Sequence, residues 1–180
     1  MSQVFSMTTA IAVSSAGLLL AALTPAFAQE VTVPEGFQSV EGDSWAYAIP
    51  QDLLETQYPQ PGLGNVTLVS QHESPDGEVF VNMVTEPYPG DINSYIQLNL
   101  DNMQSFGFEI HSQTEVMVGS LTGAEVESTV PLEPAAARVL QRFTLTNGTG
   151  YVLTCRTLEA TFETHRDRCS QILRTFYVGN

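Results

Sequence analysis

The chain has 180 residues, of which 43% are hydrophobic, so it is long and apolar enough to bury a core in a single domain. Its formal net charge is −14, it has no lysine, and its basic side chains are six arginines that all follow residue 137. Because so acidic a surface repels phosphate backbones and anionic headgroups, we expect no binding to nucleic acids. Solubility and adaptation to the surrounding medium explain this charge best, and a partner with a basic patch or loosely held divalent cations is the alternative.

Residues 1–28 have the features of a cleaved signal peptide. The apolar run Ile11–Leu23 is too short to span a bilayer, and Ala26-Phe27-Ala28 supplies the small residues that signal peptidase requires. We therefore predict cleavage after Ala28, export to the periplasm or the extracellular space, and no membrane insertion of the mature protein. An uncleaved anchor is the alternative, because residues 1–10 contain no lysine or arginine. No cysteine lies near the cleavage site, so we do not expect a lipid anchor.

The first half of the mature chain is predicted to contain three strands and one helix. Large side chains alternate at Trp45, Tyr47 and Ile49, which predicts a strand over residues 45–50. Residues 66–72 and 79–85 are the next pair of strands, joined by the turn sequence Ser74-Pro75-Asp76-Gly77. Residues 51–65 indicate a long loop with one turn of helix at most, because prolines and glycines are frequent there. Asp91 is a candidate N-cap for a helix over Ile92–Phe106, whose apolar residues recur at helical spacing.

The second half is predicted to contain four strands and a closing helix. The strands are expected at residues 108–118, 121–130, 139–145 and 151–155. Gly119-Ser120 suits a type II′ turn and Asn147-Gly148 suits a type I′ turn, so these strands form hairpins. Apolar residues at helical spacing from Phe162 to Phe176 predict the last helix.

The predicted order is β-β-β-α-β-β-β-β-α, in a single domain over residues 44–178 that follows an acidic lead-in over residues 29–43. Because hairpins join most of the strands, we expect an antiparallel sheet of about six to seven strands with the helices packed on it. This arrangement belongs to the α+β class. The sequence shows no internal repeat and no second domain.

The two cysteines lie in the closing unit of the chain, Cys155 at the end of the last strand and Cys169 on the apolar stripe of the last helix. In an exported protein, two cysteines most simply form one disulfide. A metal or redox site would need more ligands or a C-x-x-C spacing, and the chain has neither. We therefore predict a Cys155–Cys169 disulfide that ties the last strand to the last helix.

Four arginines of the closing unit are candidate contact residues for an anion or an acidic partner. Arg142, Arg156, Arg166 and Arg168 lie in the only part of the chain where basic residues outnumber acidic ones. Arginine suits this role because its guanidinium group binds carboxylates and phosphates in a bidentate manner. Pairing of these side chains with acidic residues elsewhere in the same protein is the simpler explanation, and contact with an anion or an acidic partner is the functional alternative.

The sequence contains no assembled catalytic, metal or cofactor motif. In Gly119-Ser-Leu-Thr-Gly123 the serine is the second residue and lies in a predicted hairpin, whereas a nucleophile elbow requires Gly-x-Ser-x-Gly between a strand and a helix. His111, with Glu109 and Glu115, would make at best a loose metal site, and a solvated strand face explains this pattern better. No acidic residue is placed in an apolar pocket, and no phosphate or dinucleotide motif occurs. We therefore predict no metal and no cofactor.

Five features cover nearly the whole mature chain in a characteristic order. They are the Trp45–Pro50 strand ending in Ile-Pro, the helix after Asp91, the run Gly107-Phe108-Glu109, the hairpin from Arg142 to Thr154, and the final helix that ends in Ile-Leu-Arg-Thr-Phe176. In this arrangement the chain resembles the fold shared by the PsbP family of photosystem II, the bacterial DcrB-like proteins and the Ran-binding Mog family.

The resemblance implies an accessory or binding role, because most members of these families are not enzymes. We therefore predict an exported non-enzymatic accessory or binding protein whose partner is another exported or membrane-associated protein. A hydrolase or other enzyme with an unfamiliar site is the alternative, and it would require a cleft with a desolvated carboxylate beside a histidine. The chain lacks the lipid-anchor cysteine typical of DcrB-like members and the lysines of a PsbP docking surface, so no functional residue is carried over from either family.

Overall fold

The computed structural model describes residues 32–57 and 64–179, so the predicted signal peptide and its cleavage site lie outside the described residues. None of the helices in this part of the chain is long and apolar enough to cross a bilayer. The elements are, in chain order, β1 (Phe37–Glu41), β2 (Trp45–Pro50), β3 (Leu54–Glu55), β4 (Thr67–Glu73), β5 (Val79–Pro87), α1 (Ile92–Ser105), β6 (Glu109–Val118), β7 (Leu121–Val130), β8 (Ala137–Thr146), β9 (Thr149–Leu158), a 3-10 turn (Glu159–Thr161), α2 (Phe162–Arg174) and β10 (Tyr177–Val178).

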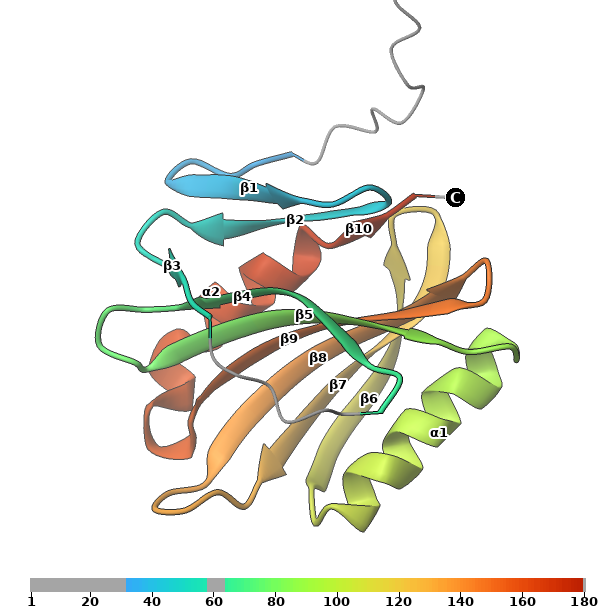
Figure 1. The fold of residues 1–180 in the computed structure, drawn as a ribbon. Coiled ribbons are helices and arrows are strands. Elements are labelled where there is room, and N and C mark those ends of the chain that lie inside the picture. Colours follow the sequence, from blue (N-terminus) through green and yellow to red (C-terminus); the bar gives the residue numbers. More distant parts are fainter. Residues whose placement is uncertain (1–31, 58–63, 180) are drawn as a thin grey trace, which may run out of the picture.

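Two antiparallel sheets form the framework of the protein (Figure 1). The large sheet has seven strands in the order β3-β4-β5-β9-β8-β7-β6, and the small sheet has three in the order β1-β2-β10. This confirms the predicted α+β class and the main antiparallel sheet. One predicted strand lies in a different sheet: β2 was expected in the main sheet, but it pairs with β1 and β10 in the small one.

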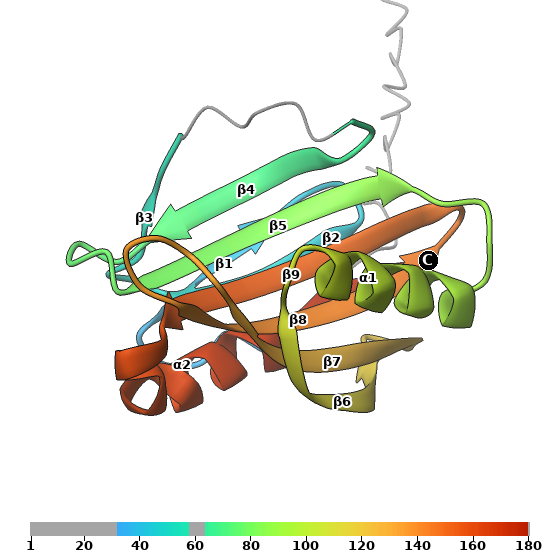
Figure 2. The same ribbon diagram turned by 90° about the horizontal axis from the view of Figure 1, so that it is seen from below.

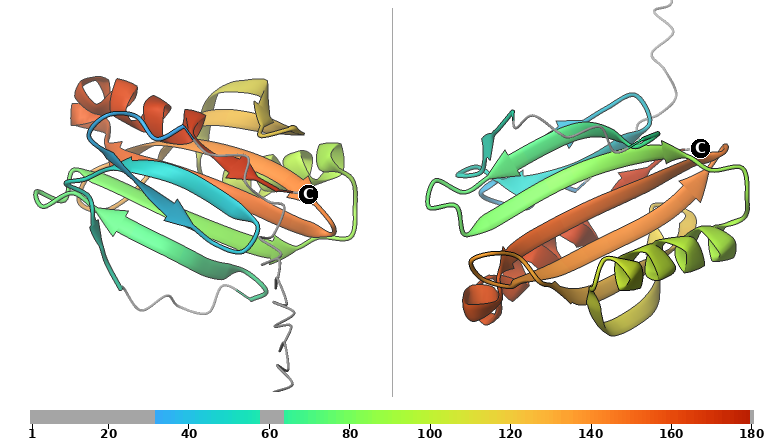
Figure 3. Two further views of the ribbon diagram at one scale, coloured as in Figure 1. Left: turned by 90° about the horizontal axis from the view of Figure 1, so that it is seen from above. Right: turned by 60° about the horizontal axis from the view of Figure 1, so that its bottom comes forward.

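Different elements cover the two faces of the large sheet (Figures 2 and 3). On one face, α2 and the small sheet pack against β5 and β9 around the main core, which includes Tyr47, Ile49, Met83, Leu153, Ile172 and Leu173. On the opposite face, α1 forms a second cluster, which includes Tyr95, Leu100, Met103, Phe143 and Val152. Neither cluster includes Phe80 or Arg156, and a hollow lies beside these two residues on the same face as α1.

The turns and the cap of α1 follow the local sequence. Asn147 and Gly148 have φ angles of 51° and 74°, and a type I′ turn requires positive φ at both positions. Gly119 has a φ of 61°, as the first central residue of a type II′ turn must. Asp91 caps α1, because its Oδ1 accepts hydrogen bonds from the backbone N–H groups of Asn93 at 2.9 Å and Ser94 at 3.0 Å.

Three short strands and two bulges, one in β4 and one in β6, were not predicted. Residues 37–41, expected to belong to the lead-in, form β1, and Phe37 and Val40 pack against the main core. The strands β3 and β10 have two residues each, which is too few for an alternating pattern. A bulge between Ile110 and Ser112 shifts the register of β6, so the alternation expected over that whole strand is interrupted.

Gly150 in β9 allows α1 to lie close to the sheet. A Cβ atom at this position would overlap the ring of Tyr95, which is fully buried and donates a hydrogen bond to Glu86 Oε1 at 2.8 Å. We expect Gly150→Ala to lower the free energy of unfolding by about 1–2 kcal/mol, because the added methyl group displaces this ring. Urea unfolding would measure the change. In a Tyr95→Leu background the same substitution should have a much smaller effect, and an equal effect in both backgrounds would contradict this packing role.

Candidate functional site

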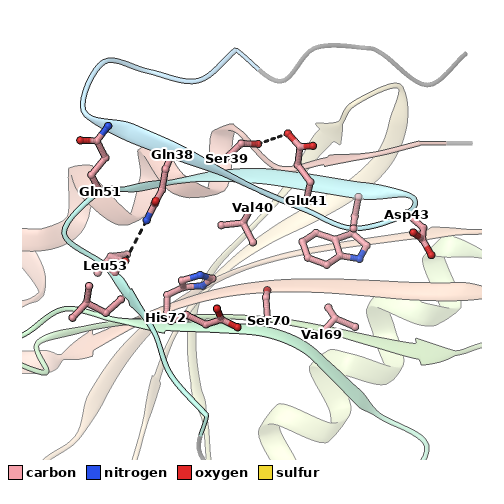
Figure 4. Close-up of a pocket in the computed structure, with 14 residues that line it drawn as sticks. Gln38, Ser39, Val40, Glu41, Asp43, Gln51, Leu53, Val69, Ser70 and His72 are labelled. Atoms are coloured by element: carbon pink, nitrogen blue, oxygen red, sulfur yellow. Dashed lines mark hydrogen bonds between the residues drawn. The ribbon is translucent and has the colours of Figure 1, made fainter. Parts of the chain in front are cut away.

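A groove of about 780 Å³ lies between the small sheet and the β3–β4 edge of the large sheet (Figure 4). One wall is formed by β1 and the turn that follows it, and the other by β3 and β4. Gln38 of β1 reaches across and donates a hydrogen bond to the carbonyl of Leu53 at 3.4 Å, while Ser39 donates to Glu41 at 2.6 Å (Figure 4). The two walls of the groove therefore belong to different sheets.

The groove combines negative charge with exposed apolar surface. Glu41, Asp43 and Glu55 line it, and its described lining residues include no lysine or arginine. Leu54 and Val69 are exposed within it, with 58% and 37% of their surface accessible. Such a surface suits a ligand that carries both positive charge and apolar groups.

A hydrogen-bonded group lies at the β4 side of the groove. Tyr47 Oη is 2.7 Å from Ser70 Oγ and 3.5 Å from His72 Nδ1. Burial raises the pKa of Tyr47 to about 12. The hydrogen bond with Ser70 lowers this pKa by a smaller amount, and the negative charge of Glu55 raises it further. Burial also lowers the pKa of His72, against an opposing effect of Glu55. At neutral pH the tyrosine is therefore protonated and the histidine is uncharged.

This hydrogen-bonded group lacks the geometry of a hydrolytic site. A serine nucleophile needs its base in direct hydrogen-bond contact, whereas Tyr47 lies between Ser70 and His72. The carboxylate that acts on His72 belongs to Glu55, which is exposed. The predicted enzyme site requires a desolvated carboxylate beside a histidine, and the described residues of the groove do not place one beside His72.

The other two histidines lie outside the groove. His165 Nε2 is 2.7 Å from Glu78 Oε2, and His111 contacts Thr129 at 2.8 Å and Glu109 at 3.9 Å. Neither belongs to a group of three or more potential metal ligands in residues 32–57 and 64–179.

Sequence reasoning did not identify the groove. Glu41 and Asp43 were assigned to the lead-in, and Glu55 to the long loop. The signal that would have revealed it is the Asp43-Ser44 turn after Gly42, between residues 37–41 and 45–50, which form a hairpin.

The structure separates the four candidate arginines instead of gathering them in one patch. Arg142 pairs with Glu125 at 2.7 Å across β8 and β7. Arg168 of α2 pairs with Asp52 at 2.5 Å. The charges of these two arginines are therefore compensated within the protein.

Arg166 belongs to a larger network centred on Glu127. Arg138 and Arg166 both pair with Glu127, at 2.7 Å and 2.8 Å, and Arg166 also pairs with Glu163 at 3.0 Å. The two guanidinium groups lie 5.2 Å and 4.5 Å from the centre of the Phe162 ring. Burial alone would raise the pKa of Glu127, but the hydrogen bonds from Arg166 and Arg138 outweigh it and hold the pKa below its ordinary value. The network ties α2 to β7 and β8.

Arg156 has different surroundings. None of the ion pairs found between described residues includes it. Its guanidinium carbon lies 4.5 Å from the centre of the Phe80 ring, in a hollow of about 340 Å³ on the α1 face of the large sheet. Burial lowers the pKa of Arg156, and the charge of Glu73 opposes this effect.

The predicted disulfide between Cys155 and Cys169 is present. It joins β9 to α2, its Cα atoms are 5.5 Å apart, and both residues are buried in the main core. The bond therefore fixes the helix that covers one face of the large sheet.

The chain matches no protein-family model and no curated protein sequence. Several solved structures resemble it, including two with TM-scores above 0.5. Cyanobacterial PsbP (CyanoP) from Synechocystis sp. PCC 6803 has a TM-score of 0.60 and 12% identity, over 79% of this chain and 92% of that chain. LpqN, involved in cell envelope biogenesis of Mycobacterium tuberculosis, has a TM-score of 0.55 and 12% identity, over 80% of this chain and 91% of that chain. At this identity the likeness concerns the fold, and the protein has the PsbP-like fold that its sequence pattern implies.

Proposed function

We propose that this protein is an exported binding protein without a catalytic centre, and that it holds a basic, extended segment of an exported or membrane-associated partner protein. The observation that carries the proposal is the groove between the small sheet and β3–β4, which has three carboxylates beside exposed apolar side chains. Lysine and arginine side chains of a partner would pair with Glu41, Asp43 and Glu55. Apolar side chains between them would contact Leu54 and Val69.

An extended conformation of the partner fits the strand that lines the groove. The outer side of β4 pairs with β3 at His72 and Glu73, and the carbonyl of Gln71 accepts a hydrogen bond from Thr56 N–H at 3.0 Å. Between Thr67 and Ser70, no described strand pairs with this side of β4. Extended peptides add to such sheet edges through main-chain hydrogen bonds, and pockets for alternate side chains then give specificity. The register shift between Leu68 and Ser70 limits this pairing to a short stretch.

Two features support export. The apolar run before Ala26-Phe27-Ala28 has the pattern of a signal peptide. The Cys155–Cys169 bond is of the kind that persists in oxidising compartments. LpqN, which shares the fold, is involved in cell envelope biogenesis, and a role at the cell envelope agrees with an accessory function for this chain.

Peptide binding tests the proposal. The probe is an eight-residue peptide of alternating lysine and valine with blocked ends, and calorimetry measures its affinity. We expect the double variant Glu41→Gln/Glu55→Gln to bind it about tenfold more weakly than the wild type, which is the loss expected for two partly exposed ion pairs. The double variant Glu115→Gln/Glu133→Gln has the same net charge but changes exposed residues outside the groove, so its affinity should stay within about twofold.

Equal losses in the two double variants would mean that the peptide responds only to net charge, and this would contradict the proposal. So would equal binding of a peptide that alternates glutamate and valine. A photoreactive side chain at Val69 then identifies the natural partner, with Leu98 on α1 as a control of similar exposure, 41% against 37%. We expect a basic segment of an exported protein to cross-link from Val69 and not from Leu98.

A further inference from the structure

We propose that the hollow beside Arg156 binds a carboxylate attached to an apolar group, as found at the C-terminus of a peptide with a large apolar last residue or in a small aromatic acid. The hollow lies on the α1 face of the large sheet and shares no lining residue with the groove. This site is therefore independent of the function proposed above.

Three neighbouring strands, β5, β9 and β8, build the base of the hollow. Strand register places its residues in two rows, one of Phe80, Arg156 and Val139 and the next of Asn82, Thr154 and Gln141. The side formed by the ends of β6 and β7 and the loop after β7 is apolar, with Phe108, Val130 and Leu132. One half of the hollow is therefore polar and carries a guanidinium group, and the other half is apolar.

Arg156 supplies the positive charge. No ion pair between described residues includes it, and its guanidinium group is held against the Phe80 ring, so it is positioned before a ligand arrives. Glu73, which pairs with Phe80 on the neighbouring strand, also acts on Arg156 through its charge. A single guanidinium group with a carboxylate in its vicinity suits a monoanion better than a phosphate dianion, which usually needs more than one cation.

The second row has hydrogen-bonding capacity left over. Gln141 donates from Nε2 to Thr154 Oγ1 at 3.1 Å, which leaves the hydroxyl hydrogen of Thr154 available for a carboxylate oxygen. Gln141 Oε1 is buried, and no described residue donates a hydrogen bond to it. A buried acceptor without a donor is destabilising, so an N–H group next to the carboxylate of a ligand would improve binding. Such an N–H group is present in the last residue of a peptide and in an acylated amino acid.

The apolar side explains why the ligand needs more than a carboxylate. Val130 and Val139 belong to a buried apolar cluster, partly buried Phe108 packs against it, and Leu132 also lines the hollow and is 40% exposed. A volume of about 340 Å³ lies at the low end of small-ligand pockets, roughly 300–1,000 Å³, and admits one aromatic or branched side chain with its carboxylate.

Titration of the intact, disulfide-bonded protein with three matched compounds tests the proposal by NMR. N-acetylphenylalanine has the carboxylate, the N–H group and the apolar ring, its amide derivative lacks the carboxylate, and 3-phenylpropionate lacks the N–H group. We expect N-acetylphenylalanine to bind and to shift the backbone signals of Thr154 and Arg156, and the amide derivative to bind at least tenfold more weakly. Comparison with 3-phenylpropionate identifies the kind of natural ligand. If 3-phenylpropionate binds more weakly than N-acetylphenylalanine, the ligand is a peptide C-terminus, and if the two bind equally, it is a small acid.

Two pairs of variants complete the test. Arg156→Gln should weaken N-acetylphenylalanine binding at least tenfold, while Arg174→Gln, an equal charge change at an exposed residue outside the hollow, should stay within twofold. Leu132→Glu places a negative charge beside the carboxylate without removing Arg156, and it should also weaken binding at least tenfold. Its control is Leu98→Glu, at a leucine of nearly equal exposure on α1. The proposal fails if the wild type binds neither acid at millimolar concentration, or if Arg156→Gln and Leu132→Glu bind N-acetylphenylalanine as the wild type does.

Discussion

Removal of the Cys155–Cys169 disulfide is expected to lower the free energy of unfolding by about 3 kcal/mol. The two cysteines are separated by 14 positions, and a cross-link that closes a loop of this size restricts the unfolded chain by about that amount. Both residues lie in the main core, so the bond connects β9 and α2 within that core. Urea unfolding of the oxidised protein, the reduced protein and the Cys155→Ala/Cys169→Ala variant would measure the loss.

The double variant also controls for side effects of the reductant. Because this variant has no disulfide, addition of the reductant should leave the unfolding midpoint of the variant unchanged. The denaturant slope should rise in the reduced wild type, because its unfolded state is less compact. Two titrating thiols in the native, non-reduced protein would contradict the disulfide. An unchanged unfolding midpoint on reduction would contradict its contribution to stability.

Glu127→Gln is expected to lower the free energy of unfolding by about 2–3 kcal/mol. The Glu127 side chain is only 12% exposed and pairs with both Arg138 and Arg166. Loss of its charge leaves two guanidinium groups beside a neutral amide. The effect should fall slightly below that of a fully buried pair, because Arg166 keeps Glu163 at 3.0 Å and Arg138 keeps Glu159 at 3.7 Å.

The effect of Glu127→Gln should depend on pH. Folding lowers the pKa of Glu127 below its ordinary 4.5, so the charged group stabilises the fold above that pH, and its contribution disappears as the pH falls through the folded-state pKa. The difference in unfolding free energy between wild type and variant should therefore shrink between about pH 6 and about pH 3. Glu163→Gln is the matched control, because Glu163 also pairs with Arg166 but is 77% exposed, and it should change stability little. A difference that is constant with pH would contradict the role assigned to the Glu127 charge.

Local sequence patterns were sufficient for the helices and for most strands. The hairpin at Asn147-Gly148 could be predicted because positive φ at two consecutive residues restricts which amino acids fit. The helix α1 could be predicted because Asp91 and the spacing of the apolar residues agree on where it begins. The disulfide followed from the number of cysteines and the predicted compartment.

The features that define the candidate sites depend on contacts between distant parts of the chain. Nothing within β2 indicates that its partners are β1 and β10, because a strand of six residues has the same pattern in either sheet. The groove could not be predicted without that pairing. Likewise, the sequence does not distinguish Arg156 from Arg142, because their cross-strand neighbours decide which of them is paired. Arg142 lies opposite Glu125 and forms an ion pair with it, whereas Arg156 lies opposite Phe80.

The composition of the small sheet has a consequence for the order in which the protein is assembled. Its central strand β2 pairs on one side with β1 and on the other with β10, and Gly179 N–H donates to the Ser44 carbonyl at 2.8 Å. A chain that folds as it is synthesised from its N-terminus therefore carries β2 with one neighbour missing until residues 177–179 are present. The small sheet, whose strand β1 forms one wall of the groove, reaches its full three strands only when synthesis is nearly finished.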